Sequence, residues 1–270
     1  VEEIGKEAKE YIQALKKAKN FQEADAAFLN YDGLQGHIST MSSLAQVRHS
    51  INTEDAFYDT ESNYWDNATP KIGEFNQEWI QTLLASPFRS NFEKKYGKVI
   101  FTNAELELKT FSPEIIPELQ KENELVTAYE KLLASAQIPP FKNDPDDRRR
   151  LAAWKAEGKW YKDNQAELDR LYDELVHLRD SMGKKLGYKD FVELGYYRMK
   201  RSCYDRADVQ KFREAVQTYV VPLAEEVFKR QAKRLGKSYP LSYADAAIEF
   251  RSGNPRPAGT PEEIVASGKK

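Results

Sequence analysis

The sequence is poor in the residues that most often form disulfides, hold metals or act as nucleophiles. Its 270 residues include one cysteine, Cys203, and three histidines, His37, His49 and His177. A single cysteine cannot form an internal disulfide, which is typical of proteins in a reducing compartment. A lone thiol is usually packed and inert. We therefore expect a cytoplasmic protein in which Cys203 is buried and has no catalytic role.

The histidines do not have the spacing of a metal site. None is followed by a second histidine four residues later, which would place two ligands on one face of a helix. His37 and His49, twelve residues apart, could share a helical face, but no third ligand is near them. The chain also has no glycine-rich phosphate loop and no serine in a nucleophile elbow. We expect no catalytic and no metal-binding residue in this chain.

Neither an excess of one charge nor a long apolar run is present. Lys and Arg number 41 and Asp and Glu 43, which gives a formal net charge of −2. No general positive field would attract nucleic acid or an anionic membrane. No run approaches the roughly 18 apolar residues of a membrane span. We expect neither nucleic acid nor a membrane among the partners.

Strand-like alternation is nearly absent, and helical patterns take its place. Apolar residues recur at three- and four-residue spacing in segments 125–133, 168–182 and 209–227. Pro222 should interrupt the last of these helices, and Gly236 should end it. Only segment 237–250 is compatible with a short strand. The expected fold class is all-α, with many helices.

Proline also marks expected helix starts, because its missing N–H has no helical partner in the first turn. An oxygen-bearing residue that can cap a helix precedes a proline at five positions. These residues are Thr69, Ser86, Ser112, Asp144 and Thr260.

One strong change of composition, "IPPFKNDPDD", runs from Ile138 to Asp147. It predicts an N-terminal helical segment, residues 1–138, and a second helical segment, residues 139–270. The last helix should begin at Pro261 and has about two turns before Lys270. A capped helix at this point suggests a polypeptide that continues.

Rings and cations are concentrated in the segment "GYKDFVELGYYRMKRSCYD", residues 187–205. Asp190 should cap a short helix that Gly195 ends. One interpretation is a packed corner with arginine–carboxylate pairs and cation–π contacts. The other is a surface that grips a peptide through tyrosine hydroxyls and arginine forks. Acidic neighbours in the segment argue against nucleic acid, because they would weaken attraction for phosphate.

Three long segments resemble oligoendopeptidase F and its relatives in the thimet-oligopeptidase family of zinc metallopeptidases. They are residues 43–61, 105–138 and 168–236, and the resemblance covers nearly the whole chain. It implies an α-helical ellipsoid with a deep channel that admits only short peptides. In such enzymes an HExxH helix and a downstream glutamate bind one zinc ion, whose activated water attacks the peptide carbonyl.

The chain departs from this family in one large respect, because it contains no HExxH. The resemblance therefore implies the N-terminal, non-catalytic half, which forms the channel wall or lid and is inactive alone. Zinc would be bound outside this chain, in the full-length enzyme. The implied partners are short peptide substrates and a C-terminal catalytic half. The alternative is a non-enzymatic α-helical module for protein interactions.

Five residues of segment 187–205 are the candidates to face the substrate channel. We choose them because their rings, hydroxyls and guanidinium groups can contact a peptide. They are Tyr196, Tyr197, Arg198, Arg201 and Tyr204.

Overall fold

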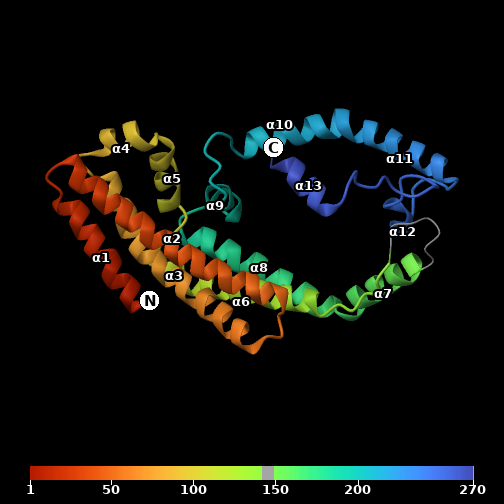
Figure 1. The fold of residues 1–270 in the computed structure, drawn as a ribbon, viewed down its shortest axis with the longest axis horizontal. Helices are drawn as coiled ribbons and strands as arrows, with labels where there is room; N and C mark the ends of the chain where they lie inside the picture. The colour runs from red at the N-terminus through yellow and green to blue at the C-terminus, as the bar shows by residue number, and fades with distance from the viewer. Residues whose placement is uncertain (142–148, 270) are drawn as a thin grey trace. The chain divides into compact units, whose positions relative to one another are not determined.

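The computed structural model describes residues 1–141 and 149–269, and its regular structure is helical (Figure 1). No strand occurs in these residues, so the all-α prediction is confirmed. The short strand allowed at residues 237–250 is wrong, because a short helix, α12 (Tyr243–Ala246), forms there instead. Nowhere in the described ranges is a helix both long and apolar enough to cross a bilayer.

The described residues divide into two compact units, each built from two stretches of chain. Unit 1 is Val1–Ser135 with Glu167–Arg206, and unit 2 is Ala136–Ala166 with Ala207–Lys270. The predicted segments, 1–138 and 139–270, are continuous stretches, whereas the chain passes between the units three times.

The helices of unit 1 precede and follow the first stretch of unit 2. They are α1 (Glu2–Lys17), α2 (Phe21–Ile51), α3 (Ala56–Leu84), α4 (Arg89–Tyr96), α5 (Val99–Leu108), η1 (Pro113–Ile115), α6 (Ile116–Ala134), α8 (Gln165–Lys185, in unit 1 from Glu167) and α9 (Phe191–Arg198). Unit 2 contains α7 (Arg149–Asp163), α10 (Arg206–Ala215, in unit 2 from Ala207), η2 (Val216–Val220), α11 (Val221–Leu235), α12 and α13 (Pro261–Gly268).

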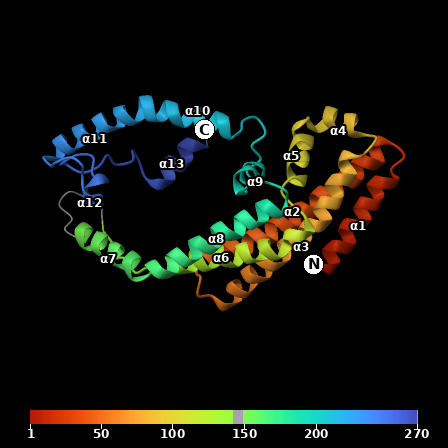
Figure 2. The ribbon, with the colours of Figure 1, turned by 180° about the vertical axis from the view of Figure 1, so that it is seen from behind.

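The main core of unit 1 lies where α1, α2 and α3 pack side by side, as both ribbon views show (Figure 2). Ile12, Phe92 and Phe101 are fully buried in it. Tyr31 of α2 stacks on Trp79 of α3, with ring centroids 4.1 Å apart and ring planes at 7°. Stacked rings of this size bury a large apolar area, so they fix the spacing of α2 and α3.

A second cluster of unit 1 positions α9. Ile115, Met182 and Leu194 are buried there, with Phe191 packed against them. Gly183 of α8 lies so close to the turn before α9 that an added Cβ would be 2.7 Å from the backbone oxygen of Asp190. Only a residue without a side chain permits this approach.

The predicted caps have different outcomes. Ser112 caps η1 and Thr260 caps α13, each with proline directly after it, as expected. The Ser86 hydroxyl accepts from the backbone N–H of Phe88, just before α4 begins. The start predicted at Thr69 is wrong, because Pro70 lies inside α3. Asp144 lies outside the described residues.

α3 continues through Pro70 because another helix supplies the missing donor. Proline at position 70 leaves the carbonyl of Asp66 without its helical N–H partner. Asn123 of α6 donates its Nδ2 group to this carbonyl at 2.8 Å. In the next position, Gln120 donates to the carbonyl of Asn67 at 2.8 Å. The proline therefore becomes a docking point for α6 instead of a helix start.

Unit 2 contains the predicted interruption at Pro222. A π-helical turn, η2, separates α10 from α11, and Pro222 is in the first turn of α11. Gly236 ends α11 in the left-handed region with φ 70°, which confirms the prediction. Gln231 of α11 is buried and donates to the carbonyls of Ala246 and Ile248. The end of α11 is thereby fastened to the segment that contains α12.

Candidate functional site

The segment 187–205 forms the corner that follows α8, and its residues lie in unit 1. Asp190 caps α9, as predicted, and its side chain accepts from the N–H of Val192. Gly195 does not end the helix, which runs to Arg198. The end is formed instead by Lys200, whose φ of 52° is in the left-handed region, and by the bond from the N–H of Arg201 to the carbonyl of Tyr196.

Arg198 is bound to a buried carboxylate that the sequence analysis missed. Glu122 of α6 is 4% exposed. Arg198 donates Nη2 to Glu122 Oε2 at 2.8 Å and Nη1 to Oε1 at 3.2 Å, while Arg179 of α8 donates Nε to Oε1 at 2.6 Å. Both guanidinium groups lie over the ring of Phe191, at 5.7 and 5.8 Å from its centroid. A carboxylate this deeply buried requires such partners.

The other four candidates contact neighbours within the corner. The Tyr197 hydroxyl donates to Glu193 at 2.8 Å, and this hydrogen bond raises the Tyr197 pKa. The guanidinium of Arg201 lies between two rings, 5.5 Å from that of Tyr196 and 5.3 Å from that of Tyr204.

These contacts correspond to the packed-corner interpretation most clearly for Arg198, which is bound at Glu122. Tyr204 is 41% exposed, and Cys203 beside it is also exposed. The expectation of a buried thiol is therefore wrong, because the loop after α9 leaves it at the surface. That the five candidates face substrate stays a prediction.

Two neighbouring cavities in unit 1 lie beside α3, and we call the pair the α3 groove. The first has a volume of about 190 Å³ and the second about 200 Å³. They share Asn76, Ile80 and Glu107, so they lie on the two sides of these residues. Arg198 lines the second cavity and connects the groove with the α9 corner. No sequence motif marked the groove, because its residues come from separate helices.

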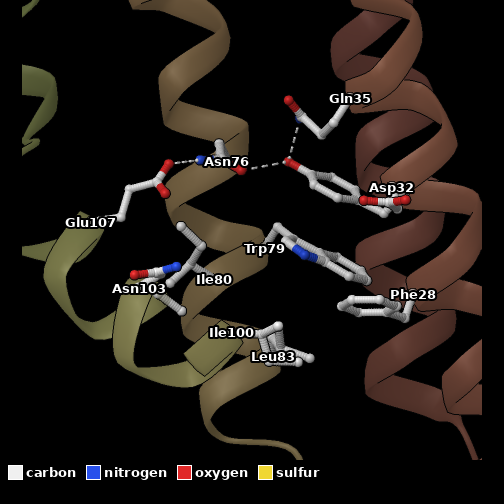
Figure 3. Close-up of a pocket in the computed structure, with 12 residues that line it drawn as sticks. Phe28, Asp32, Gln35, Asn76, Trp79, Ile80, Leu83, Ile100, Asn103 and Glu107 are labelled. Atoms are coloured by element: carbon white, nitrogen blue, oxygen red, sulfur yellow. Dashed lines mark hydrogen bonds between the residues drawn. The ribbon is translucent and has the colours of Figure 1, made fainter. Parts of the chain in front are cut away.

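A chain of hydrogen bonds crosses the first cavity (Figure 3). Gln35 donates to the Tyr31 hydroxyl at 3.0 Å, and this hydroxyl donates to Asn76 Oδ1 at 3.3 Å. Asn76 in turn donates Nδ2 to the carboxylate of Glu107. Burial raises the pKa of Tyr31, with a further contribution from the negative charge of Glu107. Tyr31 is therefore a neutral hydrogen-bonding group and no base at neutral pH.

The α3 groove is lined by amide and aromatic side chains. Its amide side chains, Gln35, Asn76 and Asn103, can both donate and accept, as a peptide backbone does. Phe28 and Trp79 supply apolar surface beside them. Over the described ranges, 1–141 and 149–269, no group of three or more His, Cys, Asp or Glu is placed to hold a metal ion.

Comparison with known proteins matches this chain to about half the length of several peptidases. Residues 1–111 match the family described as the peptidase M3 N-terminal domain. A solved protein assigned as oligoendopeptidase F is 36% identical with a TM-score of 0.93, and the match covers 100% of this chain and 50% of that one. A second such assignment, from Bacillus anthracis strain Ames, is 36% identical with a TM-score of 0.91, covering 99% and 51%. PZ peptidase A, in a structure with an inhibitor, is 37% identical with a TM-score of 0.92, covering 99% and 50%.

The fold and these matches define an all-α chain that is similar to part of known peptidases. Residues 1–111 match the N-terminal domain of the peptidase M3 family, and the whole length of the chain is similar to the N-terminal half of oligoendopeptidase F and PZ peptidase structures. The resemblance predicted from three sequence segments is thereby confirmed. The chain spans about half the length of these relatives. A comparison with curated protein sequences gave no significant match.

The raised pKa of Tyr31 predicts a loss of stability in alkali. The group ionises in the unfolded chain near its usual pKa of 10.0, but it stays protonated in the folded chain. Its contribution is complete below that pH and falls as the pH rises above it. We expect Tyr31→Phe to remove about 1.4 kcal/mol of the decrease in unfolding free energy between pH 9 and 11.

Urea unfolding at several pH values measures this difference. Tyr172→Phe is the matched control, because Tyr172 is 73% exposed on α8. An alkaline decrease that is the same in the Tyr31→Phe variant, the control and the unaltered chain would show that Tyr31 ionises freely in the folded state.

Proposed function

We propose that the chain is the N-terminal, non-catalytic half of a cytoplasmic zinc metallo-oligopeptidase that hydrolyses internal bonds of short peptides. In this role it forms part of the wall or lid of the peptide channel. The observation that carries the proposal is the similarity of the whole chain to half of oligoendopeptidases, at 36–37% identity.

The histidines of this chain do not fit a zinc site. His49 is buried, with Nε2 3.2 Å from Asp59, whose carboxylate also pairs with Lys131. His177 is exposed and pairs with Asp173 at 3.4 Å on the same helix. His37 is exposed on α2. The zinc of the proposed enzyme would therefore be held by polypeptide outside this chain, and no residue here is assigned to it.

The contribution of this half is to bind and orient the peptide. In the α3 groove, Gln35 and Asn103 would pair with backbone amides, because both polar atoms of Asn76 are already hydrogen-bonded, and Phe28 would contact an apolar side chain. At the α9 corner, Arg201 and Tyr204 are the stronger contacts among the five candidates, because Arg198 is already bound to Glu122. Such positioning lowers the barrier by holding the substrate in a reactive geometry.

Metal dependence tests this function. The polypeptide expressed from the complete natural reading frame should cleave a short fluorogenic peptide, lose activity with 1,10-phenanthroline and regain it with zinc. Residues 1–270 alone should bind no zinc and cleave nothing, because they lack the metal ligands. Activity that survives thorough metal removal, or that the 1–270 chain shows alone, would refute the proposal. A reading frame that ends at Lys270 would favour the interaction module.

The substrate role of the corner has its own test in the complete enzyme. Arg201→Ala should raise KM roughly tenfold without a change in melting temperature, since one hydrogen bond to a charged group contributes about 1.4 kcal/mol. Arg170→Ala is the control, because within residues 1–141 and 149–269 Arg170 pairs only with Glu167 and Glu174 of its own helix. A lower melting temperature with unchanged kinetics per folded molecule would assign Arg201 to packing instead.

A further inference from the structure

The first cavity of the α3 groove carries negative charge that its lining does not balance. Asp32 of α2 and Glu107 of α5 lie on its two sides (Figure 3). Among the described residues that line this cavity there is no lysine, arginine or histidine. The second cavity differs, because Arg198 lines it beside Glu107. The first cavity is therefore the acidic part of the groove.

Both carboxylates are accessible to a ligand cation. Asp32 is exposed, and its side chain forms no hydrogen bond or ion pair within residues 1–141 and 149–269. Glu107 accepts from Asn76 at one oxygen, and Lys200 lies 3.8 Å from the other. The Lys200 side chain is 58% exposed, and exposed pairs of this kind are weak, so a ligand cation can replace it.

An unpaired donor deep in the same cavity is an independent indication of a ligand. Trp79 is 4% exposed and lines the cavity. Its indole N–H can only donate, and it has no acceptor in the part of the chain that the structure describes. In Figure 3 the indole nitrogen lies on the side of the ring toward Asn103, whose amide also has no partner in these ranges. A buried donor without a partner is unfavourable, and an oxygen atom of a ligand would satisfy it.

The cavity has the size and the polarity for one charged side chain or chain end. Its volume of about 190 Å³ is several times the ~30 Å³ that one water molecule occupies. The negative charge of Glu107 acts inside it, because this charge adds to the effect of burial in raising the pKa of Tyr31. Aromatic rings such as that of Phe28 in the cavity wall also attract cations.

We propose that the first cavity binds a cationic group of the peptide substrate, which is either the N-terminal ammonium or a lysine or arginine side chain. The charge lies between Asp32 and Glu107, and a carbonyl oxygen of the same peptide accepts from the indole N–H of Trp79. The inference rests on the proposed function, because it names the class of peptide that the groove selects. A peptide without a positive charge leaves both carboxylates without a counter-charge, and it therefore binds more weakly.

The indole N–H signals of the tryptophans test this pocket at the site itself. Residues 1–270 contain four tryptophans, and Trp79→Phe assigns the nuclear magnetic resonance signal of Trp79 in the chain labelled with nitrogen-15 tryptophan. One alanine-rich pentapeptide is titrated in three forms. The first has a central lysine and both ends blocked, the second has norleucine in its place, and the third has norleucine with a free N-terminal amine.

We expect the Trp79 signal to shift with the lysine peptide, the free-amine peptide or both, and the stronger of the two identifies the preferred source of the charge. The dissociation constant of that peptide should be roughly fivefold or more below that of the blocked norleucine peptide, as one ion pair of ordinary strength provides.

Removing the charges from the chain gives the matched comparison. Asp32→Asn and Glu107→Gln keep the shape of each side chain, and each should weaken binding of the cationic peptide roughly fivefold. Glu74→Gln is the control, because Glu74 is exposed on α3 and does not line the cavity. It removes the same charge, so the affinity should stay unchanged.

The other outcomes overturn the pocket in recognisable ways. Equal binding of the cationic and the blocked norleucine peptides would refute it, and so would an equal loss of affinity in Glu74→Gln. A Trp79 signal that does not shift with any peptide would refute it as well.

Zinc-dependent cleavage by the polypeptide from the complete reading frame is the separate measurement of the proposed function. Cleavage without a charge-dependent shift of Trp79 would refute the pocket and leave the function standing. A charge-dependent shift in residues 1–270 without such cleavage would support the pocket and refute the function.

Discussion

One buried carboxylate holds the α9 corner of unit 1 together. Glu122 projects from α6 and accepts from Arg179 of α8 and Arg198 of α9, so three helices meet at two oxygen atoms. Both guanidinium groups also lie over the ring of Phe191. Each part of this arrangement depends on the others, because a buried charge without its partners is strongly unfavourable. The position of α9, and with it the wall of the α3 groove at Arg198, depends on this interaction.

A hydrogen bond to a buried polar group also joins α3 to α6. Pro70 removes a helical donor, and Asn123 replaces it across the helix interface. On its other side α3 is held to α2 by the stack of Tyr31 on Trp79. α3, whose Asn76 and Ile80 are common to both cavities, is therefore fixed from two directions. For the peptide binding that we propose, such rigidity would be an advantage, because little conformational freedom of the groove would be lost when a peptide binds.

The sequence predicted the features that depend on neighbouring residues. The all-α class, the caps at Ser112 and Thr260, and the end of α11 at Gly236 follow from local chemistry. The resemblance in three segments predicted the peptidase family.

Features that depend on distant residues were missed. The prediction of a helix start at Thr69 was wrong because Asn123 replaces the N–H donor that Pro70 lacks, and Asn123 lies 53 positions after Pro70 in the sequence. The α3 groove could not be predicted from the sequence, because its residues come from helices that lie far apart in the chain. Glu122 had a usable signal: it lies midway between Leu119 and Leu125, on the apolar side of its helix. A carboxylate at such a position requires a cationic partner.

A double-mutant cycle between Glu122 and Arg198 tests the central interaction most directly. The free energy of unfolding is measured for Glu122→Ala, Arg198→Ala and the double variant. We expect Glu122→Ala to be destabilising by about 3 kcal/mol or more, with a coupling between the two residues of at least about 1 kcal/mol. If the losses of unfolding free energy in the two single variants sum to that of the double variant within about 0.5 kcal/mol, the two side chains act independently, and the role given to Glu122 is contradicted.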